Sequence, residues 1–419
     1  MKIKNILLLS LLALSFASCS KEDDPGIEQQ EPVDAVVSFI AKATTQPGTK
    51  AEGTPTDTKI YSLNAYIADK DGNVVGYGRT GAIEDESDFN AEKTVDRIEG
   101  ILVKIVPNLN AKYQAVLIAN IADCQVKKLN EIVGKAGLDK AIGNYAAGDK
   151  ALPMVRTLEI SGLKESEKQG DGYVTNNWIN NADDGVVKRT AEETEAVELT
   201  RMLARVTVNK ITVNLSGYQP IEGQQATFKL ETLSLVNVRS GADLELKGIG
   251  DYVKGYQSNQ YVFEPVETGW IIPGTGTSGI GTTKPGAIIT DLSGTVNGAG
   301  AENKKEYSAS DLGFTRYIFP NGVKENDNLY ETGLVIGGKF QRAPGYPEEL
   351  KHFRVYLRDS NASDALRRVV ANTSYSLDIT ISGEGSGDEN HPQDNLDIKV
   401  TITAEGWKPM EQEEVVTPQ

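Results

Sequence analysis

The residue types that most often carry chemistry are scarce in this sequence. Its 419 residues include two histidines, and these, His352 and His391, lie far apart in the sequence. A histidine-based triad or a multi-histidine zinc site therefore has little material. Trp178, Trp270 and Trp407 could stack on a sugar, but scattered tryptophans in a β-protein more often belong to the core. A catalytic site made of two carboxylates stays an open alternative, because 59 acidic residues offer many pairs.

Two short motifs resemble a phosphate-binding loop and a calcium-binding loop, but the residues around each are more typical of a loop or turn without a ligand. The run GTGTSG, Gly274–Gly279, has nucleotide-loop spacing, but Pro273 precedes it and IGTTKPG follows it. No helix N-terminus can open there to hold a phosphate. The run Asp69-Lys70-Asp71-Gly72 lacks the later ligands of a calcium loop and predicts a hairpin turn. We therefore expect no catalytic residue, no cofactor and no metal, and we expect that the protein is not an enzyme.

One cysteine stands where a lipid attachment is expected. Two early lysines precede an apolar run, Ile6–Ala17, which is shorter than the roughly 20 residues of a bilayer span and has the order of a signal peptide. Small residues followed by Cys19 are typical of a bacterial lipobox. The pattern predicts a signal peptide over residues 1–18, a lipid on Cys19 and a flexible tether over residues 19–32. The alternative is a secreted protein with Cys19 as an incidental thiol.

Composition narrows the remaining classes of fold and function. The net charge is −16, with 59 acidic against 43 basic residues, which argues against sequence-independent nucleic-acid binding. If Cys19 is lipidated, Cys124 stands alone and no intramolecular disulfide can form. The 41 glycines and 16 tyrosines, with few stretches of helical period, predict an all-β fold with a few short helices.

Alternating apolar residues place strands in the first half of the chain. Lys59–Ala68 alternates and runs into an Asp-Gly step, so it predicts a hairpin with Val74–Gly78 as the return strand. Ile101–Val106 and Tyr113–Asn120 are interpreted as a second pair. An amphipathic helix that covers a sheet edge or face is predicted from residues at three- and four-residue spacing, namely Val126, Leu129, Ile132 and Val133.

A stretch without periodicity separates the two halves of the chain. It covers residues 161–196 and predicts a long loop, although Tyr173 and Trp178 suggest that part of it packs down. Alternation resumes over Arg201–Leu215, but its apolar residues change from even to odd positions along the strand. One face can stay buried only if an extra residue is inserted, so a bulge is expected near Asn209-Lys210. Ser374–Ile381 and Leu396–Ala404 then predict two half-buried strands joined by a solvated loop.

The segment after the tether alternates as well. Val33–Ala43 predicts an edge strand with one face in the core, formed by Val33, Ala35, Val37, Phe39 and Ala41. Thr44–Lys59 follows without a large apolar residue, which is the composition of an exposed loop that a protease can enter.

Four stretches, taken in order, resemble the FimA-type fimbrillins, the shaft subunits of the type V pili of Bacteroidetes. They are TKAEG before the strand KIYSLNAYI, then YQAVLIAN, then RMLARVTVNKITV, and finally NTSYSLDITISGEGSGDENHPQDNLDIKVTITAEGWKPMEQ. The last is the most specific, because a strand, a glycine-rich loop, a second strand and a tryptophan occur there in the family's order. The resemblance covers nearly the whole chain.

The resemblance implies two transthyretin-like β-sandwich domains, which we place at residues 51–197 and 198–419, after a first strand and cleavable region at residues 33–50. It implies export as an outer-membrane lipoprotein and cleavage by a trypsin-like surface protease, with Lys50 and Ala51 at the matching position. The first strand is then lost, and the C-terminal strand of an identical or related pilin subunit fills its place. In this chain the donor would lie within residues 407–416, with four candidate side chains, Trp407, Met410, Val415 and Val416.

Two functions from different classes therefore remain open. One is a structural pilin that polymerises by strand exchange. The other is a monomeric or tip-located surface lipoprotein that binds host ligands or glycans. They differ in the fate of the first strand, because a shaft subunit must lose that strand and carry a usable donor. A frayed tail is the alternative for the C-terminal segment.

Overall fold

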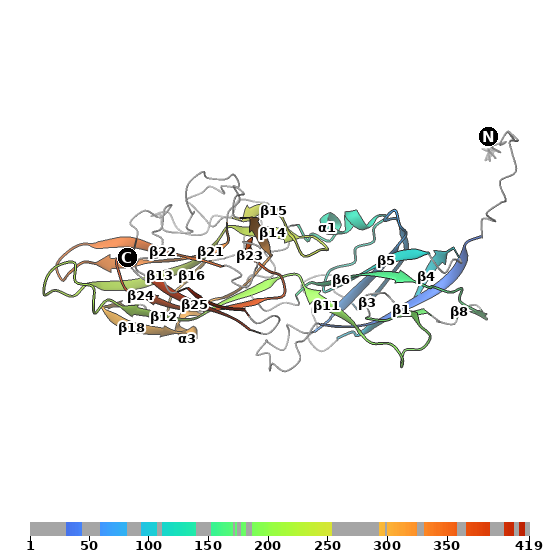
Figure 1. Cartoon of the computed structure of the whole chain (residues 1–419), viewed down its shortest axis with the longest axis horizontal. Coiled ribbons are helices and arrows are strands. Elements are labelled where there is room, and N and C mark those ends of the chain that lie inside the picture. The colour runs from blue at the N-terminus through green and yellow to red at the C-terminus, as the bar shows by residue number, and fades with distance from the viewer. Residues whose placement is uncertain are drawn as a thin grey trace, which may run out of the picture.

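The computed structural model describes residues 31–43, 59–81, 94–106, 111–139, 152–170, 172–173, 177–181, 187–253, 293–297, 300–324, 331–357, 366–385, 398–405 and 410–414. The regular structure of these residues is almost entirely β-strand, with a few short helices, so the predicted fold class is confirmed. The strands form two lobes placed end to end, with the N-terminal half of the chain in one and the C-terminal half in the other (Figure 1). Among the described residues, no helix is long and apolar enough to cross a membrane.

Nine strands form the connected β-structure of the N-terminal lobe. Its order is β10-β9-β1-β11-β6-β5-β2-β3, with β4 paired to β1. The strands are β1 (Val33–Ala43), β2 (Ser62–Ala68), β3 (Val74–Gly81), β4 (Arg97–Ile105), β5 (Lys112–Ala119), β6 (Met154–Ser161), β9 (Asn177–Ile179), β10 (Val187–Lys188) and β11 (Val197–Arg201). A separate small hairpin joins β7 (Lys168–Gln169) to β8 (Gly172–Tyr173).

The strands of this lobe pack in two layers. A Cβ added at Gly76 of β3 would lie 2.6 Å from Val103 Cγ2 of β4, and one added at Gly78 would lie 2.6 Å from Ile101 Cγ1. Strand β4 therefore lies face to face against β3, with side chains of both layers in one buried cluster. The predicted pairing of residues 101–106 with 113–120 is wrong. Strand β5 is apolar on both faces and pairs with β2 and β6, whereas β4 alternates and pairs with β1.

The hairpin predicted after Ala68 is present. The Asp69 carboxylate accepts hydrogen bonds from the backbone N–H groups of Asp71 and Asn73, each at 2.9 Å. Gly72 has φ +77°, a left-handed conformation that glycine adopts without steric cost. The acidic run is thus a turn, as predicted. Strand β3 extends to Gly81 and is longer than the predicted return strand.

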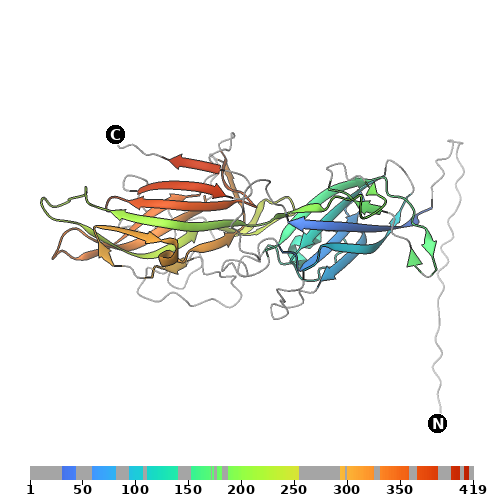
Figure 2. The same cartoon turned by 90° about the horizontal axis from the view of Figure 1, so that it is seen from below.

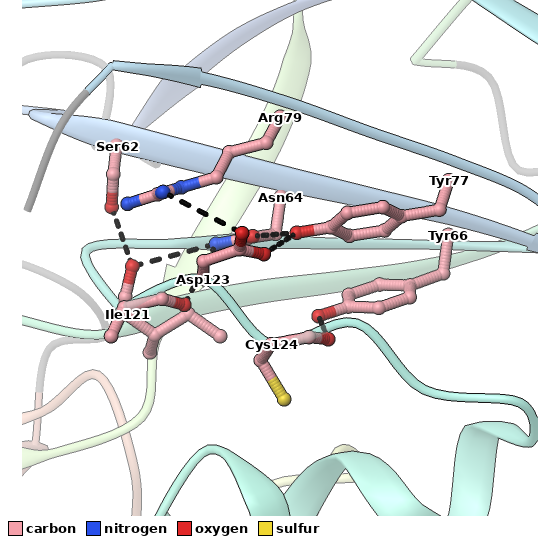
Figure 3. A network of polar contacts seen from close by, with 9 residues as sticks. Ser62, Asn64, Tyr66, Tyr77, Arg79, Ile121, Asp123 and Cys124 are labelled. Carbon is pink, nitrogen blue, oxygen red and sulfur yellow. Dashed lines mark hydrogen bonds and ion pairs between the residues drawn. The ribbon is translucent and has the colours of Figure 1, made fainter. Parts of the chain in front are cut away.

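The second face of β2 is also buried, under the segment that follows β5 (Figure 3). The Tyr66 hydroxyl donates to the Cys124 carbonyl at 2.6 Å, and the Ser62 hydroxyl donates to the Ile121 carbonyl at 2.8 Å. Tyr77 and Arg79 of β3 both reach Asp123. These contacts attach the segment to the outer face of the sheet without a disulfide, since Cys124 is a buried free thiol.

The predicted amphipathic helix is short. It consists of a 3-10 turn, η2 (Leu129–Glu131), and one turn of α-helix, α1 (Ile132–Lys135). Leu129 and Ile132 are buried against the sheet face, so the predicted coverage of a face is confirmed. The loop predicted over residues 161–196 is wrong in part, because it contains β9 and β10, and β9 pairs in parallel with β1.

The C-terminal lobe has two main sheets, which form an upper and a lower layer in Figure 1. One has the order β18-β12-β24-β25-β26 with β19 on β12, and the other has the order β16-β13-β21-β22 with β17 on β13. The elements are β12 (Ala204–Asn214), β13 (Thr227–Val236), β14 (Val238–Ala242), β15 (Gly248–Val253), β16 (Ser293–Thr295), β17 (Ala301–Glu302), β18 (Lys304–Ser308), α3 (Ala309–Leu312), β19 (Thr315–Ile318), β20 (Asn321–Lys324), β21 (Gly333–Gln341), β22 (Glu348–Tyr356), β23 (Leu366–Val369), β24 (Ser374–Ile381), β25 (Ile398–Glu405) and β26 (Met410–Glu414).

The bulge predicted in β12 is confirmed. In its parallel ladder with β24, Val208 faces Leu377 and Lys210 faces Asp378, so Asn209 is the extra residue. Val208 and Ile211, which differ in parity, are both fully buried as a result. The predicted C-terminal pair is confirmed too, because β24 and β25 pair antiparallel from Ser374↔Glu405 to Ile381↔Ile398.

The two lobes meet through apolar side chains. A single buried cluster includes Leu129, Ile132 and Leu138 of the first lobe with Met202 and much of the second. The backbone sheets separate between Arg201, the end of β11, and Ala204, the start of β12. This point lies a few residues after the expected boundary between 51–197 and 198–419, and the division into domains stays a prediction.

Candidate assembly site

Strand β1 is part of the core of the N-terminal lobe. Ala35, Val37 and Phe39 are fully buried, and Ala41 is nearly so. Val33 packs on the margin of the same cluster. The five residues predicted to share the core-facing side therefore do so, and Val36 on the opposite side is buried as well.

The prediction that β1 is an edge strand is wrong. Over Val37–Phe39 it lies between β4, which runs antiparallel, and β9, which runs parallel. Its last residues, Ala41–Ala43, pair in parallel with Val197–Leu199 of β11. Its parallel partners come from far along the sequence, so local alternation gave no sign of them. Both backbone edges of β1 are thus bonded, and removing it would open an apolar trough with unpaired backbone groups on either side.

Side chains complete the bonding of β1 just before its ladder with β9 begins. The Val36 N–H donates to Ser166 Oγ at 2.7 Å, and Asn177 Nδ2 donates to the Val36 carbonyl at 3.1 Å. The Ser166 N–H donates to the Asp34 carbonyl at 2.9 Å. Asn177 is fully buried and Ser166 almost so. These residues lie in the region predicted from the sequence as a loop, where Tyr173 and Trp178 indicated that part of it packs down.

A charged cluster stands at the start of β1. The Asp34 carboxylate accepts hydrogen bonds from Lys104 Nζ and from the Tyr173 hydroxyl. The bond from Lys104, followed by that from Tyr173, lowers the pKa of the Asp34 carboxyl below its ordinary value of 3.8. The same contacts raise the pKa of Lys104 and of Tyr173. The cluster ties β4 and the β7–β8 hairpin to the first strand.

This cluster predicts an acid-dependent loss of stability. Because the folded-state pKa of Asp34 lies below its unfolded value, its ionised form stabilises the protein above about pH 4, and that stabilisation is lost as the pH falls through the lowered pKa. We expect Asp34→Asn to be less stable than the natural chain at neutral pH. We also expect the difference to shrink from about pH 4 to pH 2. Urea unfolding across this range measures it, and parallel pH profiles would contradict the assignment.

An exposed ion pair lies at the other end of β1. Lys42 Nζ lies 3.1 Å from Glu198 Oε1, and both side chains are largely exposed, so the pair adds little stability. The chain leaves the strand at Ala43. The predicted cleavage residues, Lys50 and Ala51, and the predicted lipidation residue, Cys19, lie outside the described residues.

The C-terminal segment pairs with its own lobe. Strand β26 lies antiparallel to β25, from Ala404↔Met410 to Val400↔Glu414. It forms the rim of the six-stranded sheet, near the C-terminus in Figure 2. The described part of the tail is therefore a strand and not a frayed end. Of the donor candidates, Met410 begins this strand, whereas Trp407, Val415 and Val416 lie outside the described residues.

The remaining candidates for chemistry are not brought together. His352 is buried in β22 and Trp178 is buried in β9. Gly274–Gly279, Trp270 and His391 lie outside the described residues. Among the residues that the structure does describe, no group of three or more His, Cys, Asp or Glu side chains could hold a metal ion.

The fold and the site together define a two-lobed β-protein whose first strand fills a groove in its own first lobe. Residues 35–201 match the family described as major fimbrial subunit protein (FimA). This match ends at the last residue of β11, where the backbone sheets separate. The predicted resemblance to the FimA-type fimbrillins is thereby confirmed over these residues.

Solved structures share the fold over nearly the whole chain. A proposed cell adhesion protein from Bacteroides eggerthii has a TM-score of 0.53 at 16% identity, with 91% of this chain and 98% of that chain covered. Another from Parabacteroides distasonis has a TM-score of 0.52 at 14% identity, covering 90% and 99%. A fimbrilin, FimA, from Porphyromonas gingivalis has a TM-score of 0.51 at 17% identity, covering 91% and 99%. No curated protein matches the chain significantly.

Proposed function

We propose that the chain is a structural subunit of a surface pilus that supports adhesion and colonisation, and not an enzyme. Its precursor is exported as an outer-membrane lipoprotein through Cys19 and is cut by a trypsin-like surface protease after Lys50. Strand β1 then leaves, and a strand from an identical or related pilin subunit replaces it. The observation that carries the proposal is the placement of β1, which fills the core yet is followed by a stretch, residues 44–58, without a large apolar residue.

The energetics of the groove favour replacement over an empty state. Three fully buried side chains of β1, those of Ala35, Val37 and Phe39, would leave with the strand. A fully buried valine or phenylalanine contributes about 1.5–3 kcal/mol relative to exposure. Backbone groups on both sides of the groove would also lose their partners. A matured subunit therefore has a strong drive to accept another extended strand.

The position of β26 suits it to the role of a strand that moves. Among the strands that the structure describes, it pairs with β25 alone, along one edge, over five residues. Strand β1 is paired on both edges. Releasing β26 from its own lobe therefore breaks a backbone ladder on one edge, whereas releasing β1 breaks ladders on both, so β26 is the strand more easily freed to reach a neighbouring subunit.

Limited proteolysis tests this proposal. The chain starting after Cys19 is treated briefly with a trypsin-like protease, the new N-terminus is sequenced, and unheated samples are run on a denaturing gel. We expect one main cut between Lys50 and Ala51, and a ladder of polymers that heating dissociates into monomers. Lys50→Gln should block both the cut and the ladder, and deletion of residues 408–419 should allow the cut but not the ladder.

The second candidate is a monomeric or tip-located surface adhesin. Two observations favour it: β1 is bonded on both edges, and β26 lies on its own lobe. A cut that leaves a stable monomer, or no preferred cut at all, would contradict the polymerising pilin and support the adhesin.

A further inference from the structure

At one residue, Val36, the first-strand groove contacts its strand through side chains, just before the ladder with β9 begins. At Val36, the N–H donates to Ser166 Oγ at 2.7 Å and the carbonyl accepts from Asn177 Nδ2 at 3.1 Å. Both partners are buried, with exposures of 3% for Ser166 and 0% for Asn177. One hydroxyl and one amide thus bond the two backbone groups of a single residue, as a neighbouring strand would.

Asn177 is held in position by contacts that do not involve β1. Its Oδ1 accepts from the Lys164 N–H at 2.9 Å and from Arg189 Nη1 at 3.2 Å, and its Nδ2 donates a second hydrogen bond to the Lys164 carbonyl at 2.9 Å. These contacts stay when β1 leaves, so the amide remains aimed at the groove. A buried donor without a partner there would cost free energy until another strand arrives.

We propose that Ser166 and Asn177 form a binding site for the backbone amide of any extended peptide that occupies the groove. This inference rests on the proposed strand replacement and adds a selection rule to it. The occupant must present an N–H and a carbonyl at the position of Val36. A proline at this position has no N–H and is rejected. The side chains at the positions of Ala35, Val37 and Phe39 are selected separately, by the core.

A peptide exchange experiment tests the site in the full chain. A sequence for a site-specific protease is inserted between Thr45 and Gln46, the chain is cut there, and labelled synthetic peptides of residues 31–43 compete for the groove. One peptide is natural. In the other, an ester replaces the amide before Val36, which removes the N–H and leaves every side chain unchanged. Each peptide is measured against the natural chain and against Ser166→Ala.

We expect the ester to weaken binding about tenfold when Ser166 is present and no more than about twofold in Ser166→Ala, because the hydroxyl is the partner of the missing N–H. The comparison cancels the general effect of an ester, and the peptide change cannot impair folding of the protein. Equal losses in the two proteins would overturn the binding site while leaving strand replacement intact. A groove that no peptide enters would overturn strand replacement itself, and the site with it.

Discussion

Replacing Phe39 with alanine should lower the free energy of unfolding of the full chain by about 3–5 kcal/mol, the cost of truncating a buried phenylalanine to alanine in a core. Phe39 is fully buried near the middle of β1, where β4 and β9 flank the strand on either side. The surrounding strands cannot close on the cavity without breaking their ladders. Denaturant unfolding measures the loss.

The matched control for Phe39→Ala is Lys42→Ala. Lys42 lies on the same strand with an exposed side chain, so its loss should change the free energy of unfolding by no more than about 0.5 kcal/mol. The proposed function adds a second expectation. Once β1 has been replaced, Phe39→Ala should have no effect on the heat stability of the assembled polymer. A polymer that melts earlier in this variant would mean that β1 is still in its groove.

Replacing Asn120 with alanine should cost about 3 kcal/mol, both in the precursor and after cleavage. The Asn120 side chain accepts from the Tyr61 N–H at 2.8 Å and donates to the carbonyls of Lys59 at 3.0 Å and Leu152 at 2.8 Å. Its backbone has φ 61°, which asparagine tolerates better than alanine. It thus holds together the ends of β2, β5 and β6.

Asn120→Gly separates the two causes. Glycine removes the same side-chain hydrogen bonds but accepts a positive φ without strain, so it should be less destabilising than alanine at this position. Thermal unfolding of both variants, before and after cleavage at Lys50, makes the comparison. The contacts of Asn120 are with residues that remain after the proposed cleavage. A loss that disappears on cleavage would therefore contradict the anchoring role of Asn120.

Phe39 and Asn120 differ in how well the sequence predicted their roles. Local signals predicted the hairpin at Asp69–Asn73 and the bulge at Asn209, because turn chemistry and the parity of buried residues depend on adjacent positions. The apolar face of β1, including Phe39, was predicted in the same way. The roles of Asn120 and Asn177 were not, because an asparagine gains its partners only when distant segments meet.

Pairing of strands was the least predictable feature. Strand β4 follows the same alternation as other strands, yet its partner is β1 and not the next strand along the chain. The three residues of β9 have no alternation at all and are buried by their position beside β1. Burial on both faces and parallel pairing depend on segments more than a hundred residues apart, and no local periodicity reports them.

The composition of the assembled polymer tests strand replacement most directly. Polymer formed after cleavage is washed, dissociated by heat and analysed by mass spectrometry for the peptide that contains residues 33–43. We expect subunits that begin at Ala51 and polymer without this peptide, because a strand from a neighbouring subunit has taken its place. A polymer that retains one copy of the peptide for each subunit would contradict strand replacement.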